Sequence, residues 1–109
     1  MAFDENTAKR VRDLLSEECT TDEKRMFGGL AFMVKGHMCC GVIGQDLVVR
    51  VGPNQHEDAL SQPHARVMDF TGRSMKGFIY VSPPGYSKKV NLRNWIKMGL
   101  RFVSSLPAK

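Results

Sequence analysis

The chain has 109 residues, of which 42% are hydrophobic and 25% charged, as is typical of one globular domain with one core. This composition excludes a disordered tail, a collagen-like chain and a coiled-coil rod. The net charge is +5, but residues 1–23 carry seven acids against three bases, and the chain after Asp69 carries eight bases and no acid. The basic C-terminal third indicates an anionic partner or a pairing with the acidic N-terminal end, and a solvated surface explains it about equally well.

Residues 4 to about 18 are expected to form a helix, with Asp4 as its N-cap. Apolar residues recur there at three- and four-residue spacing: Ala8, Val11, Leu14 and Leu15. Residues 19–22 are expected to be a loop. From Lys24 the apolar period changes to two, and the pattern predicts strands at 30–34, 38–43 and 47–51. Glycine-containing turns join them, which indicates an antiparallel meander.

Beyond Pro53, the pattern predicts a helix of about two turns at 55–61, strands at 66–70 and 77–82, and a helix from an Asn91 cap to about Leu106. Residues 71–76 are expected to be a loop. The element order α-β-β-β-α-β-β-α predicts an α+β fold over residues 1–109. We expect a single two-layer domain with one antiparallel five-stranded sheet and its helices packed on one face.

Two surfaces of this fold are candidate binding sites. On the last helix the large apolar residues share one face, which turns Arg93, Lys97 and Arg101 outward at i, i+4 and i+8. The predicted partner-binding surface comprises Arg73, Lys76, Lys88, Lys89, Arg93, Lys97 and Arg101. The other face of the sheet is too apolar for simple exposure to water, so a helix, a partner or a second copy is expected to cover it. The predicted self-association face comprises Met33, Cys39, Ile43 and Val48, and the expected assembly is a homodimer.

The segment from His37 to Cys40 is the strongest candidate for chemistry. In a strand, His37 and Cys39 point to one face and Cys40 to the other, and this spacing does not suit zinc. We therefore expect no metal, no cofactor and no catalytic residue, and we interpret the cysteines as buried strand residues. A thiol-dependent enzyme that uses Cys39 or Cys40 with His37 is the alternative. The Phe27-Gly28-Gly29 segment is read as a bend entering a strand rather than as a phosphate-binding loop.

The sequence also predicts the compartment. Three cysteines, no secretory signal and no apolar run of about 20 residues indicate a cytoplasmic protein without a membrane span.

Four segments, in order along the chain, resemble the N-terminal domain of the TfoX/Sxy family: KRMFGGLAF at 24–32, MCCG at 38–41, RVGP at 50–53 and MDFTGRSMKG at 68–77. The resemblance implies an α+β domain with an antiparallel sheet. The family is named for regulators of natural competence, which are thought to act as co-activators beside a cyclic-AMP receptor protein. It has no agreed catalytic residues. Full-length members look like two domains, so this chain is expected to be a stand-alone N-terminal domain.

We therefore expect a small non-enzymatic regulatory or interaction module that acts through protein–protein contacts. By resemblance, its partner would be the transcription machinery or a cyclic-AMP receptor protein. Weak nucleic-acid binding through the basic C-terminal third is the first alternative, and the thiol-dependent enzyme is the second.

Overall fold

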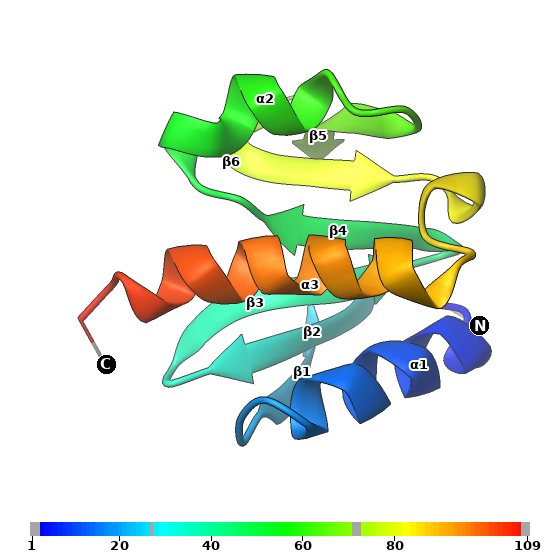
Figure 1. Cartoon of the computed structure of the whole chain (residues 1–109), viewed down its shortest axis with the longest axis vertical. Helices are drawn as coiled ribbons and strands as arrows, with labels where there is room; N and C mark the ends of the chain where they lie inside the picture. The colour runs from blue at the N-terminus through cyan, green and yellow to red at the C-terminus, as the bar shows by residue number, and fades with distance from the viewer. Residues whose placement is uncertain (1–2, 27, 71–72, 108–109) are drawn as a thin grey trace.

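The computed structural model describes residues 3–26, 28–70 and 73–107. In this part of the chain, three helices cover one face of a six-stranded antiparallel sheet (Figure 1). The predicted α+β class is confirmed, with one strand more than expected. The elements are α1 (Glu5–Ser16), β1 (Asp22–Met26), β2 (Gly29–Val34), β3 (His37–Ile43), β4 (Asp46–Arg50), the 3-10 turn η1 (Pro53–Gln55), α2 (His56–Leu60), β5 (Ala65–Phe70), β6 (Arg73–Val81), the 3-10 turn η2 (Pro83–Gly85) and α3 (Lys89–Ser104).

The additional strand is β1, whose first residue was expected to belong to a loop. It pairs antiparallel with β2, from Asp22 opposite Met33 to Met26 opposite Gly29. Its sequence is charged at four of five positions and shows no apolar alternation. Strand β1 does not need apolar alternation, because it is an edge strand of the sheet. Charged side chains protect such an edge from pairing with other chains.

Two other boundaries differ from the prediction. Strand β6 begins at Arg73, inside the expected loop, because the backbone of Arg73 pairs with that of Phe70. Helix α3 begins at Lys89 rather than after an Asn91 cap, and no side chain caps its first turn. The predicted cap of α1 is confirmed, since the Asp4 carboxylate accepts a hydrogen bond from the Thr7 backbone N–H at 3.0 Å.

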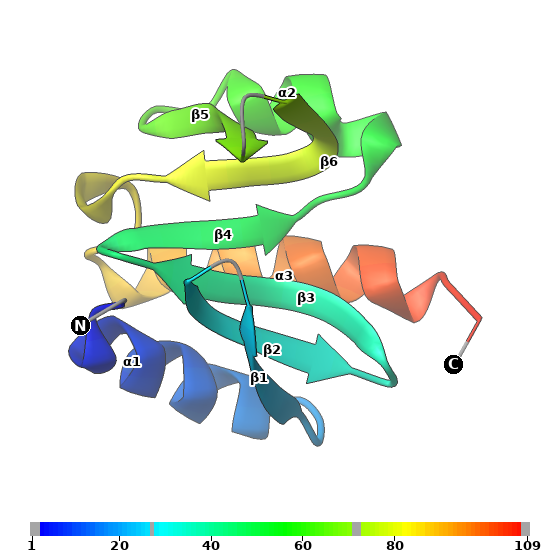
Figure 2. The ribbon, with the colours of Figure 1, turned by 180° about the vertical axis from the view of Figure 1, so that it is seen from behind.

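The sheet order is β1-β2-β3-β4-β6-β5, so the predicted meander forms its first part. Helix α3 lies across β3 and β4, α1 lies beside it, and α2 covers β5 and β6 (Figures 1 and 2). The main core lies between these helices and the sheet. Among its fully buried members are Leu15, Phe32, Leu47, Ile79 and Leu92. Among the described residues, none of the helices has the length and apolar character that a membrane crossing requires.

A β-bulge in β3 changes which way its side chains point. Phe32 of β2 pairs with Cys40, but the next residue, Met33, pairs with Met38, so Cys39 is the extra residue. Cys39 and Cys40 therefore both belong to the helix-side core, and Met38 belongs to the cluster on the opposite face. The strict alternation that placed Cys39 with Ile43 is wrong at this point, because a bulge changes the side-chain phase.

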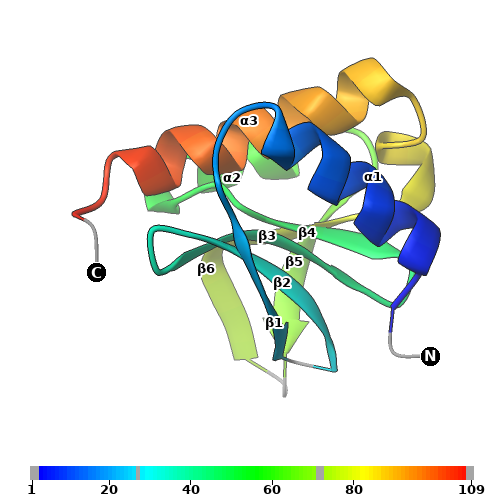
Figure 3. The same ribbon diagram turned by 90° about the horizontal axis from the view of Figure 1, so that it is seen from below.

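The face away from the helices is covered by the sheet's own curvature. Figure 3 shows the sheet strongly curled, with β1 and the β5–β6 end turned away from the helices. Inside this curve Ala31, Met38, Val48 and Met68 are buried, and Val48 is 0% exposed. The expectation that a two-layer fold leaves Val48 uncovered is therefore wrong, since it assumed a flat sheet.

Candidate interaction surface

Helix α3 presents one side to the core and the opposite side to solvent. Its buried residues are Leu92, Trp95, Ile96, Gly99 and Val103. This stripe rests on β3 and β4 and fixes the orientation of the helix. The basic residues of α3 therefore stand on a rigid support, as the helical pattern predicted.

We call Lys97 and Arg101 the basic ridge. Both are exposed, and neither makes an ion pair with another described residue. Arg93 differs, because its guanidinium lies 3.7 Å from a carboxylate oxygen of Glu17 at the end of α1. The acidic N-terminal end of the chain thus neutralises one of the three predicted charges and leaves the basic ridge free.

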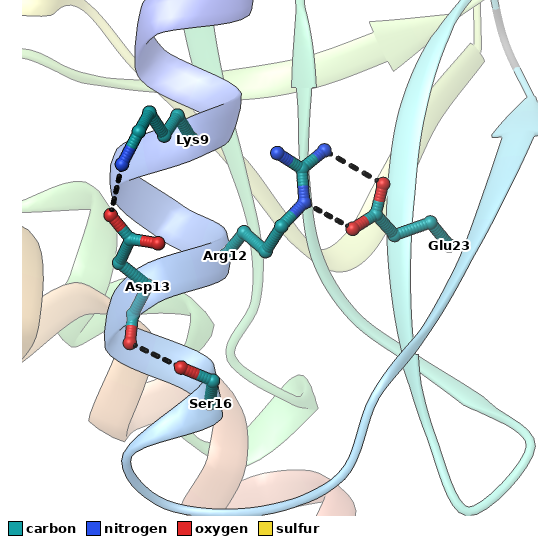
Figure 4. A network of polar contacts seen from close by, with 5 residues as sticks. All are labelled: Lys9, Arg12, Asp13, Ser16 and Glu23. Carbon is teal, nitrogen blue, oxygen red and sulfur yellow. Dashed lines mark hydrogen bonds and ion pairs between the residues drawn. The ribbon is translucent and has the colours of Figure 1, made fainter.

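Two acids, Asp13 of α1 and Glu23 of β1, are paired locally, as Figure 4 shows. Lys9 Nζ lies 2.8 Å from Asp13 Oδ2, and Arg12 donates two hydrogen bonds to Glu23 of β1. The bond from Arg12 is the main reason why the pKa of Glu23 lies below its ordinary value. The Arg12–Glu23 pair joins α1 to β1, whereas the Lys9–Asp13 pair lies within α1, and both carboxylates are engaged by these local partners.

The other predicted basic residues are distributed more widely. Lys88 and Lys89 are exposed at the start of α3, and Lys76 is exposed on β6. The side chain of Arg73 lies outside the described residues. Arg50 on β4 is held between two rings, at 5.4 Å from the Phe78 centroid and 5.2 Å from that of Phe102.

A groove that the sequence did not predict runs along the flank of α3 that faces η2. It has a volume of about 490 Å³ and lies between α3, the loop before β5 and the turn η2. Its lining comprises Gln62, Pro63, His64, Pro84, Gly85, Ser87, Lys88, Asn91, Asn94, Trp95 and Met98. No sequence motif joins these three segments, so only the spacing of Asn91, Asn94 and Met98 on one helix flank could have indicated it.

Backbone geometry holds this groove in shape. The Trp95 indole N–H donates to the carbonyl oxygen of Gly85 at 3.2 Å, which ties η2 to α3. His64 has a left-handed backbone with φ +69°, which is costly for a residue other than glycine. A Cβ at Gly85 would lie 2.7 Å from Val81 Cγ1 and 3.0 Å from His64 Cβ, so the two loops meet only because Gly85 has no side chain.

The burial and contacts of the segment from His37 to Cys40, which suggested thiol chemistry, differ from those of an active site. Cys39 and Cys40 are both 0% exposed. The hydrogen bond with Cys39 and complete burial raise the pKa of Cys40 well above its ordinary value, which favours an inert thiol. Nε2 of His37 lies 2.6 Å from the carbonyl oxygen of Pro107, within hydrogen-bond distance. Among the described residues, no three His, Cys, Asp or Glu side chains gather as a metal site would require.

The predicted self-association face is only partly assembled. Cys39 points to the helix-side core and Val48 is buried within the curled sheet, whereas Met33 and Ile43 remain partly exposed.

Of the Phe27-Gly28-Gly29 segment, Phe27 lies outside the described residues. Gly28 has φ +76°, and a Cβ at Gly29 would lie 2.3 Å from the Val42 carbonyl oxygen, which agrees with a bend entering β2.

A curled antiparallel sheet, covered on one face by three helices of which the last is basic on its outer side, defines a small two-layer α+β domain. The chain belongs to the TfoX N-terminal domain family, whose model matches residues 13–103. The resemblance seen in the sequence is thereby confirmed for nearly the whole chain. No curated protein and no solved structure matches the chain.

Proposed function

We propose that this chain is a small, non-enzymatic, cytoplasmic regulatory module related to competence regulation, and that it acts by binding an acidic surface of a protein partner in transcription control. The basic ridge is the observation that carries the proposal. Lys97 and Arg101 are exposed on a firmly packed helix and have no ion-pair partner among the described residues, while Glu17, Asp13 and Glu23 are paired nearby.

Unpaired charges on a rigid helix suit recognition of an acidic surface. Complementary charge raises the rate of encounter and fixes the orientation of the two proteins. The helix loses little freedom when it binds, because its opposite side is already buried on β3 and β4. The family relationship supports a cyclic-AMP receptor protein as the first partner to test.

The non-enzymatic part of the proposal is supported by the state of the cysteines. A nucleophilic thiol requires access and a lowered pKa, whereas Cys39 and Cys40 are fully buried and the pKa of Cys40 is raised. The His37 ring is engaged with the Pro107 carbonyl. These contacts favour a structural role for the segment.

The test measures binding to the purified cyclic-AMP receptor protein of the source organism by isothermal titration calorimetry. We expect saturable binding that weakens as salt rises, and a loss of about tenfold or more in affinity for the double variant Lys97→Glu, Arg101→Glu, equivalent to ~1.4 kcal/mol. The double variant Lys24→Glu, Lys35→Glu is the matched control, because it reverses the same number of charges at exposed lysines outside α3. Circular dichroism confirms that each variant is folded.

A second arm replaces the protein partner with a DNA duplex. Binding to DNA alone, with a salt slope of about 0.9 per phosphate neutralised, would replace the proposal by nucleic-acid binding. Expression of competence genes in a deletion strain provides the cellular readout. The wild-type chain should restore it and the folded double variant should not, and equal rescue by both would overturn the role of the basic ridge.

A further inference from the structure

We propose that the groove beside α3 receives an extended acidic segment of the partner protein. The proposal deepens the proposed function and rests on it, because it names the second surface that the same partner would contact. The groove lies on one flank of α3, and the basic ridge runs along the outer side of the same helix.

Free amide groups in the groove match the main chain of an extended peptide. The side chains of Gln62, Asn91 and Asn94 line it and make no hydrogen bond with another described residue. Each amide offers both a donor and an acceptor, as a peptide group does. Asn91 and Asn94 are separated by about 4.5 Å along the helix axis, which is less than the length of about 6.6 Å that two residues of an extended chain span. One segment running along α3 therefore meets both amides.

The apolar part of the lining favours a peptide over a nucleic acid. Met98 and Pro84 supply a surface for one apolar side chain of the segment. Trp95 is only 6% exposed, and its indole N–H is bonded to Gly85, so its ring presents no open face for a base to stack on. The groove is therefore left with its amide groups and a small apolar surface for recognition, and this combination suits a peptide.

Charge determines what kind of peptide fits. No acidic residue lines the groove, and Lys88, which does line it, makes no ion pair with another described residue. The basic ridge adds positive potential along the same helix. A segment carrying Asp or Glu is attracted to this potential, whereas a basic segment is repelled.

The test uses Trp95 as the reporter, because it is the single tryptophan of the chain and lines the groove. The probe is a short synthetic peptide rich in Asp and Glu with interspersed Leu. Its counterpart carries Asn and Gln in place of every acid, and a single-stranded DNA oligonucleotide is the third probe. We expect a saturable change in Trp95 fluorescence with the acidic peptide, and much weaker binding of the other two.

Variants then identify which residues of the chain the peptide contacts. The double variant Asn91→Ala, Asn94→Ala should weaken binding by about tenfold or more. Asn6→Ala should not, since Asn6 is an exposed asparagine on a different helix. Unfolding curves verify that all variants are folded, and a calorimetric titration verifies that the fluorescence change reports binding.

Three results would overturn the inference: no binding of the acidic peptide, preferential binding of the oligonucleotide, or peptide binding that the double asparagine variant leaves unchanged. The variant Lys97→Glu, Arg101→Glu separates this inference from the proposed function. Peptide binding that depends on these two residues but not on Asn91 and Asn94 would overturn the groove and leave the basic ridge standing. The binding experiment with the whole partner protein decides the proposed function independently.

Discussion

Gly99 of α3 lies directly against Cys39 of β3. A Cβ placed at Gly99 would lie 2.8 Å from the carbonyl oxygen of Cys39 and 3.1 Å from its Sγ. The bulge turns Cys39 toward the helix, and the missing side chain at Gly99 makes room for it. The approach of α3 to the sheet, and with it the position of the candidate interaction surface, depends on this contact.

Gly99→Ala is therefore expected to destabilise the domain. The added methyl group meets strand backbone, and overpacking of this kind costs about 1–3 kcal/mol. Higher helix propensity offsets about 1 kcal/mol of this, leaving a net loss of up to roughly 2 kcal/mol in the free energy of unfolding. Urea unfolding measures it. Ser104→Ala, at an exposed site of the same helix, should stay within about 0.5 kcal/mol of wild type. A Gly99→Ala protein about 1 kcal/mol more stable than wild type, as helix propensity alone would give, would contradict the close contact.

Thiol alkylation should distinguish the three cysteines. Cys39 and Cys40 are fully buried, so iodoacetamide should leave them unmodified in the folded protein. Cys19 is partly exposed, and burial raises its pKa, so it should react slowly and faster at alkaline pH. Mass spectrometry after timed quenching counts the modified sites. All three should react in denaturant, and rapid native labelling of Cys39 or Cys40 would reopen the thiol-enzyme alternative.

His56 should be required for the connection between α2 and β6. Its Nδ1 accepts a hydrogen bond from the Gly77 backbone N–H at 3.0 Å in a buried site. His56→Ala leaves that donor unpaired, which we expect to cost about 1–3 kcal/mol. His56→Asn should recover part of the loss, because its amide oxygen can accept from the same N–H. Amide hydrogen exchange at Gly77 reports the bond directly, and unchanged protection in His56→Ala would contradict it.

The Arg12–Glu23 pair predicts a pH dependence on the acid side. The hydrogen bond from Arg12 lowers the pKa of Glu23 below its ordinary 4.5, so the pair stabilises the fold above that pH. Its contribution is lost as pH falls through the lowered folded-state pKa. Both side chains are partly exposed, so Glu23→Gln should cost about 0.2–1 kcal/mol at neutral pH.

Urea unfolding across the acid range measures this effect. The difference between wild type and Glu23→Gln should shrink as the pH falls. Combining it with Arg12→Ala in a double-mutant cycle isolates the pair, and a coupling that persists unchanged at low pH would show that the charge of Glu23 is not its source.

Some of the candidate site could be predicted from the sequence. The apolar period of α3 placed Arg93, Lys97 and Arg101 on its outer side, because helical side chains repeat every 3.6 residues whatever surrounds them. The pairing of Arg93 with Glu17 could not be predicted, since it depends on how α1 packs beside α3. The groove could not be predicted either, because its lining comes from three segments that meet only in the folded chain.

By itself the sequence determined the α+β class, the meander and the two amphipathic helices, because apolar periodicity is a local property of the chain, as is the Asp4 cap of α1. Tertiary structure alone decided that β1 forms, that Cys39 faces the helices and that Val48 is buried. An edge strand needs only a neighbour's backbone, a bulge reverses side-chain phase without changing residue type, and the curl of a sheet comes from strand twist. These three features depend on contacts between distant segments, which residue periodicity does not record.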